Sequence, residues 1–384
     1  GQTVFVTGEA GAGKTTLLRA FEARMSGARL LRGACEDLSI PEALGPLRDI
    51  AGDAGVDLDA LFRDERDRLD VFGRLLFAIE APDQTALLLI EDLHWADEAT
   101  LDFLRFAARR LRGRRILLVV SSRDDETEGR PQIRRALGGV PPFDVTRIAL
   151  QPLSTEAVAR MAAGTRQDAD ELYRITGGNA FYVSELLKVG VGEGLRSLQD
   201  TILHRIGRLH PDVQTVIEAV SVFPRRAERA WALDVAGSGD EDVIDMAADT
   251  GLIEDRDGYL AFRHEIARQV VENTLRSGRR RRLNKALLAV MQTAGTVPNA
   301  RLLHHARAAD DLTETARLAP VAGREALAAG ANRQAADYLA IAVDLADPQD
   351  TGPFAALLFD AGEACRLANR MLDAVGFFER ALSV

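Results

Sequence analysis

The sequence predicts a parallel α/β domain followed by helical modules, and three observations support this fold class. A short β-branched run, Thr3–Thr7, leads directly into a glycine-rich loop that ends in a Lys-Thr pair. Two uninterrupted apolar runs, Ala86–Ile90 and Ile116–Val120, are typical of strands that are buried on both faces of a parallel sheet. From Leu283 onward the sequence is rich in alanine and has helical spacing.

The glycine-rich loop, residues 8–15, reads GEAGAGKT and matches the phosphate-binding pattern G-x-x-x-x-G-K-[ST]. It follows a strand and opens a helix, expected over Thr16–Met25, which is the context that phosphate binding requires. Its glycines let backbone amides turn toward a phosphate, and the helix N-terminus adds positive potential. In this pattern Lys14 bridges the β- and γ-phosphates of ATP, and the Thr15 hydroxyl binds Mg²⁺.

The residues predicted to bind the nucleotide are therefore Gly8, Glu9, Ala10, Gly11, Ala12, Gly13, Lys14, Thr15 and Thr16. The alternative is a glycine-rich turn without a ligand. It is disfavoured because lysine is rare here: the chain has only Lys14, Lys188 and Lys285, and one of them stands where the pattern needs it.

Acidic residues end the strand Ala86–Ile90. Because ligands lie at the carboxyl ends of strands in open α/β sheets, both acids are expected to face the nucleotide. Glu91 stands at the usual metal-binding position, where it would share the metal with Thr15, and Asp92 stands at the position that activates water. The more common order is Asp followed by Glu or Asp. Here a glutamate precedes the aspartate, and this exchange of the two acids predicts slow hydrolysis of ATP, with a turnover below about 1 s⁻¹. The alternative is that both acids cap a turn.

Arg123 follows the next apolar strand, after a pair of serines. A cation at this position is predicted to lie beside the γ-phosphate and to respond to its presence. The alternative is a surface arginine, since arginine is abundant in this chain.

Further elements complete the predicted nucleotide-binding domain, residues 1–151. Arg29–Ala34 and Val145–Leu150 are the remaining expected strands. A helix is expected over Ala99–Leu111, where leucine and alanine recur at helical spacing. Strands that alternate with helices predict a parallel sheet with right-handed crossovers.

A change of pattern after Pro152 predicts two further modules. Residues 152–194 are expected to form a helical lid whose first helix is capped by Ser154. Helices continue to about Thr250, with breaks at Gly177-Gly178, Gly190–Gly194, His210-Pro211 and Gly237–Gly239. Leu252-Ile253 and Tyr259–Phe262 flank an acidic turn and predict a hairpin, so residues 195–276 are interpreted as a winged-helix domain.

Residues 277–384 carry a weak internal repeat at an offset of 39 residues. Ala335, Tyr338, Leu339, Ala342 and Val343 align with Ala374, Phe377, Phe378, Ala381 and Leu382. This spacing is one face of a helix, and the pattern is typical of tetratricopeptide-like helix pairs. The chain ends inside such a repeat, so we expect a segment of a longer protein.

The composition narrows the class of protein. The 384 residues, 47% hydrophobic and 28% charged, exclude a disordered chain and predict two or three domains. The net charge of −10 does not indicate a nucleic-acid surface. The two cysteines, Cys35 and Cys365, exclude a disulfide scaffold and fit a reducing compartment. No leader or membrane-length apolar run is visible, so we expect a cytoplasmic protein without a membrane partner.

The chain resembles the ATPase region of the large LuxR-type transcriptional regulators, which belong to the signal-transduction (STAND) class of AAA-like P-loop ATPases. The resemblance covers essentially the whole chain, and its most specific elements are the phosphate loop and the EDLHWAD stretch, Glu91–Asp97. The other matching stretches are LRGACEDLSIPEALGPLRD, LLVVSSRDD, TGGNAFYVSELL, LRSLQDTILHRIGRL and YLAFRHEIARQVVENTL.

The resemblance implies a switch rather than a metabolic enzyme. ADP holds a closed monomer, exchange for ATP permits self-association, and an inducer is sensed by the C-terminal repeats. The family's regulators bind DNA through a C-terminal helix-turn-helix, which is not visible before Val384.

Two single residues carry over from the same resemblance. His264 matches a winged-helix histidine that reaches the β-phosphate of ADP, although a packed structural histidine is the alternative. Gly178-Asn179-Ala180 matches a lid motif in which Ala180 replaces the usual proline near adenine.

Other functions remain open from the sequence alone. The winged helix could bind DNA directly, since Arg276–Arg282 is a basic run, although a solvated helix start with paired arginines is favoured. The ATPase could instead regulate a fused or bound cyclase or kinase. A P-loop kinase acting on a small molecule is disfavoured by the modules that follow the lid.

The histidines do not indicate a further metal site. His94 is interpreted as a packed structural residue, and His304-His305 have no other ligand at metal-binding spacing, so no metal other than Mg²⁺ is expected.

Overall fold

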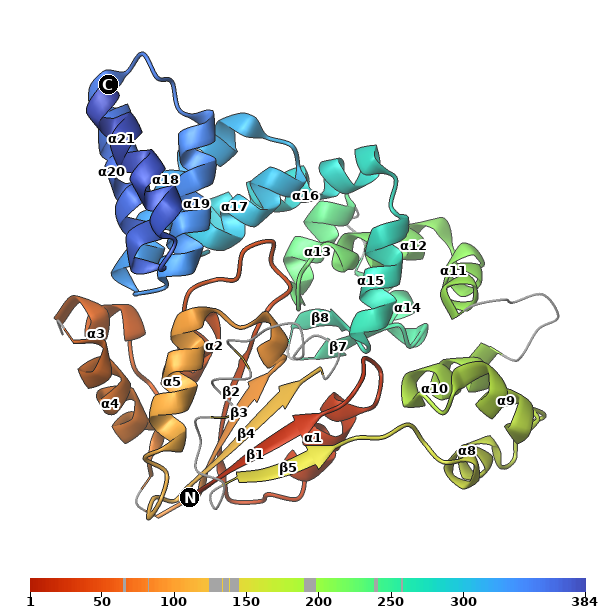
Figure 1. Cartoon of the computed structure of the whole chain (residues 1–384). Helices are drawn as coiled ribbons and strands as arrows, with labels where there is room; N and C mark the ends of the chain where they lie inside the picture. The colour runs from red at the N-terminus through yellow and green to blue at the C-terminus, as the bar shows by residue number, and fades with distance from the viewer. Residues whose placement is uncertain are drawn as a thin grey trace. The chain divides into compact units, whose positions relative to one another are not determined.

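The computed structural model describes residues 1–64, 67–81, 83–123, 133, 138, 145–189, 198–237, 241–256 and 258–384, and Figure 1 shows the path of the chain. The chain divides into two compact units. The first unit comprises Gly1–Thr7, Met25–Ile148 and Ala294–Val384, and the second comprises Gly8–Arg24 and Ala149–Thr293. The N-terminal strands and the C-terminal helices therefore belong to the first unit, and the phosphate loop belongs to the second.

The first unit is built on a five-stranded sheet with the order β2-β3-β4-β1-β5. Its strands are β1 (Gln2–Thr7), β2 (Arg29–Ala34), β3 (Ala86–Glu91), β4 (Ile116–Ser122) and β5 (Val145–Ala149). The pairs β2–β3, β3–β4 and β4–β1 are parallel, and every residue of β3 is buried, as its apolar run predicts. The predicted parallel sheet is thus confirmed, and the carboxyl ends of β1, β3 and β4 share one edge.

Short helices accompany the sheet in this unit (Figure 1). They are α2 (Gly45–Asp53), α3 (Leu58–Asp64), α4 (Arg68–Ile79), the single 3₁₀ turn η1 (Leu93–Trp95) and α5 (Glu98–Ala108). The α5 helix ends three residues before the predicted Leu111. The rings of Phe72 on α4 and Phe103 on α5 meet edge to face, with centroids 5.4 Å apart.

The C-terminal helices of the first unit form a 39-residue repeat, as the sequence predicts. They are α17 (Asn299–Ala308), α18 (Leu312–Ala328), α19 (Asn332–Leu345), α20 (Thr351–Leu367) and α21 (Met371–Ser383). Both α18 and α20, and both α19 and α21, begin 39 residues apart. A Cβ added to Gly323 on α18 would lie 2.6 Å from Leu339 on α19, and one added to Gly362 on α20 would lie 2.6 Å from Phe378 on α21. Each glycine therefore allows the same close approach within its own helix pair.

The repeats contact the segment that follows β2. Arg301 on α17 forms an ion pair with Glu36. The Ser39 amide donates to Nδ1 of His304 at 3.1 Å, and the Tyr338 hydroxyl donates to the Ile40 carbonyl at 3.1 Å. Residues 36–40 are thus held between the sheet and two helices of the repeats.

The second unit starts with α1 (Lys14–Glu22) and three helices after the sheet, α8 (Thr155–Ala162), α9 (Ala169–Thr176) and α10 (Ala180–Val189). These three helices share a small apolar core that includes Val158, Leu172 and Val183. The predicted cap is confirmed, because Ser154 Oγ accepts from the Ala157 amide at 3.2 Å. The predicted break at Gly190–Gly194 lies outside the described residues.

The rest of the second unit combines helices with a small sheet. The helices are α11 (Leu198–Gly207), α12 (Pro211–Ser221), α13 (Arg229–Ala236), α14 (Asp242–Asp249), α15 (Glu265–Thr274) and α16 (Ser277–Ala294). The predicted hairpin is confirmed by the antiparallel pairing of β7 (Ile253–Arg256) with β8 (Tyr259–Phe262). A third strand, β6 (Ala227–Glu228), pairs with β8 and was not predicted, because two residues give no periodic signal.

In the basic run, Arg279 pairs with Glu218 at 2.8 Å, which agrees with the interpretation of paired arginines at a helix start. Among the helices that the structure describes, none is both long and apolar enough to span a bilayer.

Candidate functional site

The phosphate loop turns directly into α1. Gly13 caps the helix in the left-handed conformation, with φ of 96°, and Gly11 also has a positive φ of 76°. The helix begins at Lys14 and ends at Glu22, so the predicted bounds Thr16–Met25 were wrong at both ends. The left-handed glycine is the reason for the early start, since it lets the chain enter the helix without an intervening turn. The first amides of α1 have no intrahelical partners, and its first turn holds no acidic residue that would repel an anion.

The side chain of Lys14 is buried within this loop. Its Nζ donates to the Gly8 carbonyl at 2.7 Å and to the Glu9 carbonyl at 2.9 Å. The ammonium therefore lies among the amides that surround an anion in such loops. The side chains of Thr15 and Thr16 are exposed at the start of α1, where a phosphate and its metal can reach them.

The segment that is expected to form the lid contacts the phosphate loop through backbone atoms of the loop. Asn179 Nδ2 donates to the Ala10 carbonyl at 2.8 Å, and the Phe181 amide donates to the Gly11 carbonyl at 3.1 Å. A Cβ on Gly11 would lie 2.6 Å from Asn179 Oδ1 and 3.1 Å from Ile266 of α15. Asn179 and Phe181 thus bind the loop directly, a contact that the sequence pattern did not reveal.

His264 lies next to this contact. It precedes α15, and its ring meets the ring of Phe181 with centroids 4.4 Å apart. Burial lowers its pKa from the usual 6.5 to about 4, an effect that Glu185 opposes and that Lys188 and Arg19 reinforce. The imidazole is therefore neutral at pH 7 and can donate one hydrogen bond.

The acidic residues lie at the carboxyl edge of the sheet in the first unit. Glu91 ends β3, and its Oε1 lies 3.5 Å from Nε of Arg32 on the neighbouring strand β2. Asp92 has a left-handed backbone with φ of 55°, and its amide donates to Ser121 Oγ at 3.2 Å. Arg32 was missed in the sequence, because only the pairing of β2 with β3 places it near Glu91.

Arg123 reaches the same edge from β4. Its side chain is buried, and its guanidinium carbon lies 5.1 Å from the centre of the Trp95 ring. His94 is fully buried, and its ring lies 4.4 Å from that of Trp95. The structure thus brings Glu91, Asp92 and Arg123 to one sheet edge.

Asp97 was also missed, although it belongs to the EDLHWAD stretch. It is buried and accepts hydrogen bonds from the Ala99 and Thr100 amides at 2.9 and 3.1 Å, so it caps α5. The sequence carried a signal for this role, because Asp97 directly precedes Glu98 and an apolar helical pattern.

The residues predicted to bind Mg²⁺ have suitable chemistry. The Thr15 hydroxyl is exposed, and Glu91 offers a carboxylate, so both are oxygen donors of the kind that Mg²⁺ takes together with nucleotide phosphates. Within the part of the chain that the structure describes, no cluster of three or more His, Cys, Asp or Glu side chains is arranged to hold a metal.

Comparison with known proteins is consistent with this geometry. Residues 1–120 match the AAA ATPase domain family. An uncharacterized protein of Rhizobium meliloti (strain 1021) is 25% identical in an alignment that is 426 positions long with its gaps and covers 90% of this chain and 40% of that protein.

A solved structure shows the same fold. The crystal structure of a Signal Transduction ATPase with Numerous Domains (STAND) from Pyrococcus horikoshii, which has a tetratricopeptide repeat sensor, aligns with a TM-score of 0.60 and 16% identity. The match covers 100% of this chain and 61% of that chain, so the chain spans less than two thirds of either protein. The chain therefore carries a P-loop ATPase region of the AAA kind, followed by a helical C-terminal region, in the fold of a STAND ATPase.

Proposed function

We propose that this chain is an ATP-binding signal-transduction switch with slow ATPase activity. The proposal depends on two hydrogen bonds between the lid and the phosphate loop. Asn179 donates to the Ala10 carbonyl, and Phe181 donates to the Gly11 carbonyl. A bound phosphate that changes the conformation of the loop must also change these hydrogen bonds. The nucleotide shifts the equilibrium between the closed and open states of the protein only if the two states bind it with different affinity. The loop, the lid and α15 thus form a unit that senses the bound nucleotide.

The proposed chemistry assigns a role to each predicted residue. The amides of residues 8–16 and the Lys14 ammonium bind the phosphates, while Thr15 and Glu91 hold Mg²⁺. The metal would neutralise charge on the β- and γ-phosphates. Asp92 orients water, and Arg123 stabilises charge on the γ-phosphate. Hydrolysis is slow because Asp92 has a short side chain for this task and because Arg32 competes for the Glu91 carboxylate.

We further propose that the switch is the regulatory part of a LuxR-type transcriptional regulator. In this proposal residues 152–194 form the lid, 195–276 a winged-helix domain and 277–384 a tetratricopeptide-like sensor for an inducer. The second unit supports the winged helix with its helices and its three-stranded antiparallel sheet. DNA contact would be made by a helix-turn-helix outside these residues.

The experiment that tests the switch is analytical ultracentrifugation with Mg²⁺ and either ADP or a slowly hydrolysed ATP analogue. We expect a monomer with ADP and a concentration-dependent increase in sedimentation coefficient with the analogue, because ATP permits self-association. The Lys14→Ala variant, which should not bind nucleotide, is the control and should sediment identically under both conditions. Identical sedimentation of the parent protein in both nucleotides would refute switching by self-association.

Replacing His264 with alanine is expected to weaken ADP binding more than ATP binding, by about tenfold for one lost hydrogen bond to a charged phosphate. The neutral imidazole can donate to a β-phosphate, which is terminal only in ADP. Isothermal titration calorimetry with both nucleotides measures the two dissociation constants. His210→Ala is the matched control, since His210 is exposed in the same unit. An equal loss of both affinities in His264→Ala would leave His264 with a packing role only.

A further inference from the structure

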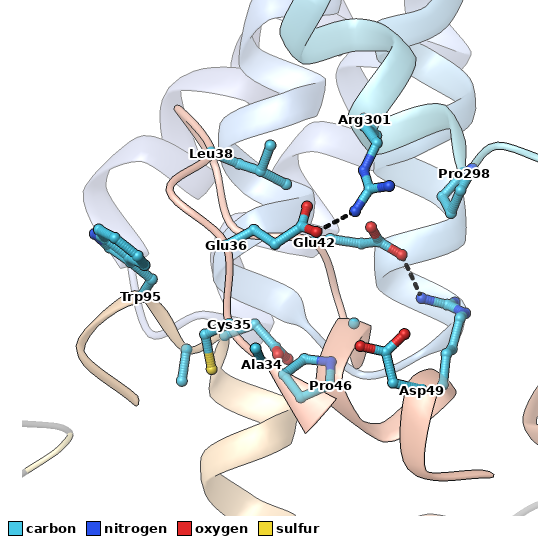
Figure 2. Close-up of a pocket in the computed structure, with 14 residues that line it drawn as sticks. Ala34, Cys35, Glu36, Leu38, Glu42, Pro46, Asp49, Trp95, Pro298 and Arg301 are labelled. Carbon is cyan, nitrogen blue, oxygen red and sulfur yellow. Dashed lines mark hydrogen bonds and ion pairs between the residues drawn. The ribbon is translucent and has the colours of Figure 1, made fainter. Parts of the chain in front are cut away.

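Each unit contains an ion pair that joins segments far apart in the sequence. In the first unit Arg301 pairs with Glu36 beside a cavity of about 160 Å³, and Figure 2 shows this guanidinium pointing toward the carboxylate. Among the described residues, none that is predicted to bind the nucleotide lines that cavity. In the second unit Arg19 pairs with Glu254, and Arg19 belongs to the helix that begins at Lys14. The second pair therefore bears on the phosphate loop.

The pair between Arg19 and Glu254 is bidentate. Nη1 of Arg19 donates to Oε2 of Glu254 at 3.1 Å, and Nη2 donates to Oε1 at 2.6 Å. Two hydrogen bonds of this kind fix the relative orientation of the two groups as well as their distance. The side chains are 39% and 22% exposed, so either one can be replaced without leaving an unpaired charge in the core.

The pair connects α1 to the β7–β8 hairpin at a defined place. Arg19 lies in the last turn of α1, the helix that the phosphate loop opens. Glu254 lies on β7, an edge strand of the three-stranded sheet, directly opposite Ala261 on β8. His264 follows soon after Ala261 and precedes α15. The position of Glu254 against α1 therefore sets where the hairpin presents His264.

Two further contacts place the segment after β8 beside the phosphate loop. A Cβ added to Gly11 would lie 3.1 Å from Cδ1 of Ile266, so the first turn of α15 approaches the loop closely. The ring of His264 packs on Phe181, whose amide donates to the Gly11 carbonyl. Burial is the main cause of the lowered pKa of His264, and the Arg19 guanidinium adds to it, which shows that this cation lies within electrostatic range of the imidazole.

We propose that Arg19 and Glu254 are positioning residues that hold His264 toward the phosphate loop and thereby slow the release of ADP. The inference rests on the proposed function, in which the loop binds the phosphates and His264 donates to the β-phosphate of ADP. While the pair is intact, the hairpin stays against α1 and His264 stays within reach of that phosphate. When the pair is broken, the hairpin leaves α1 more often, and ADP loses this hydrogen bond.

The test measures the release of ADP that carries a fluorescent N-methylanthraniloyl group, displaced by excess unlabelled ADP in the presence of Mg²⁺. Glu254→Arg is the decisive variant, because it replaces a negative charge beside α1 with a positive one. The attraction of this new charge for the phosphates would by itself slow release, whereas loss of the ion pair should accelerate release about two- to fivefold. Unchanged or slower release from folded Glu254→Arg would overturn the proposal.

Reversing both charges keeps the net charge of the parent and lets the pair form in the opposite orientation. We expect Arg19→Glu alone to accelerate release, and the double variant with Glu254→Arg to release ADP within about twofold of the parent rate. Arg24→Glu is the matched control, since Arg24 is exposed just beyond α1 in the same unit, and it should leave the rate unchanged. A double variant as fast as the faster single variant would contradict coupling through the pair.

A dependence on His264 separates positioning from a general loosening of the hairpin. In a His264→Ala background the hydrogen bond to the β-phosphate is already lost, so adding Arg19→Glu should change ADP release less than about twofold. Release of a slowly hydrolysed ATP analogue with the same label should also change less than that of ADP, because the β-phosphate is terminal only in ADP. Equal acceleration by Arg19→Glu with and without His264 would refute the route through His264.

The same measurements distinguish failure of this inference from failure of the proposed function. A folded parent protein that does not bind the labelled ADP saturably would refute the proposed function, and the inference with it. Saturable binding with release that does not respond to Glu254→Arg would refute the positioning role alone. Glu254→Gln keeps the size of the side chain and removes only its charge, so it provides a milder variant that should also release ADP faster than the parent. Circular dichroism checks the folding of every variant.

Discussion

Replacing Lys14 with alanine is expected to remove detectable ATP and ADP binding while the chain stays folded. The Lys14 ammonium is buried and is held by the Gly8 and Glu9 carbonyls, so it is preorganised at the place where we expect phosphates to bind. Truncating one partner of such a buried charge contact costs about 2–5 kcal/mol, so we expect a loss of affinity of about 100-fold or more. Equilibrium binding of radiolabelled ATP measures this loss.

The control for this variant is Lys285→Ala, which removes an exposed lysine from α16 and should bind nucleotide normally. Thermal unfolding followed by circular dichroism checks that both variants fold. If folded Lys14→Ala bound ATP like the parent, the assignment of the phosphate loop would be wrong.

Replacing Gly33 with alanine is expected to destabilise the first unit by at least about 2 kcal/mol. Gly33 is buried in β2, and a Cβ there would lie 2.2 Å from the carbonyl oxygen of Pro46 in α2. The obstacle is backbone, so neither a rotamer change nor a small side-chain shift relieves it, and α2 must move away from the sheet. Urea unfolding followed by Trp95 fluorescence in the Trp231→Phe background measures the change.

The matched control is Gly52→Ala in α2 itself. No heavy atom lies within 4 Å of a Cβ at this exposed position. Alanine favours the helix over glycine by about 0.5–1 kcal/mol, so the urea midpoint should stay the same or rise. A drop in Gly52→Ala as large as that in Gly33→Ala would show that the effect is not caused by close packing of α2 on β2.

The sequence predicts the sheet well because its signals are local. The apolar run of β3 predicts a strand buried on both faces, and the glycines and Lys14 of the phosphate loop predict both its place after β1 and its chemistry. The 39-residue repeat is also local, since it depends on helical spacing within single segments.

The features that the sequence did not reveal depend on contacts between distant segments. Nothing near Glu91 indicates that Arg32 lies beside it, because strand order decides that neighbour. The hydrogen bond from Asn179 to Ala10 joins residues far apart in the chain. The ion pair between Arg301 and Glu36 likewise forms only when α17 reaches the segment after β2.

The matching glycine contacts of the repeats also bear on how this region can change in length. Gly323 accommodates Leu339, and Gly362 accommodates Phe378, at equivalent places in successive helix pairs. Duplication or loss of a complete 39-residue unit preserves this fit, whereas an insertion of one residue within α19 or α21 rotates the large side chain away from its glycine. Length variation is therefore compatible with stable packing only in whole 39-residue units, and each added or lost unit would lengthen or shorten the helical C-terminal region.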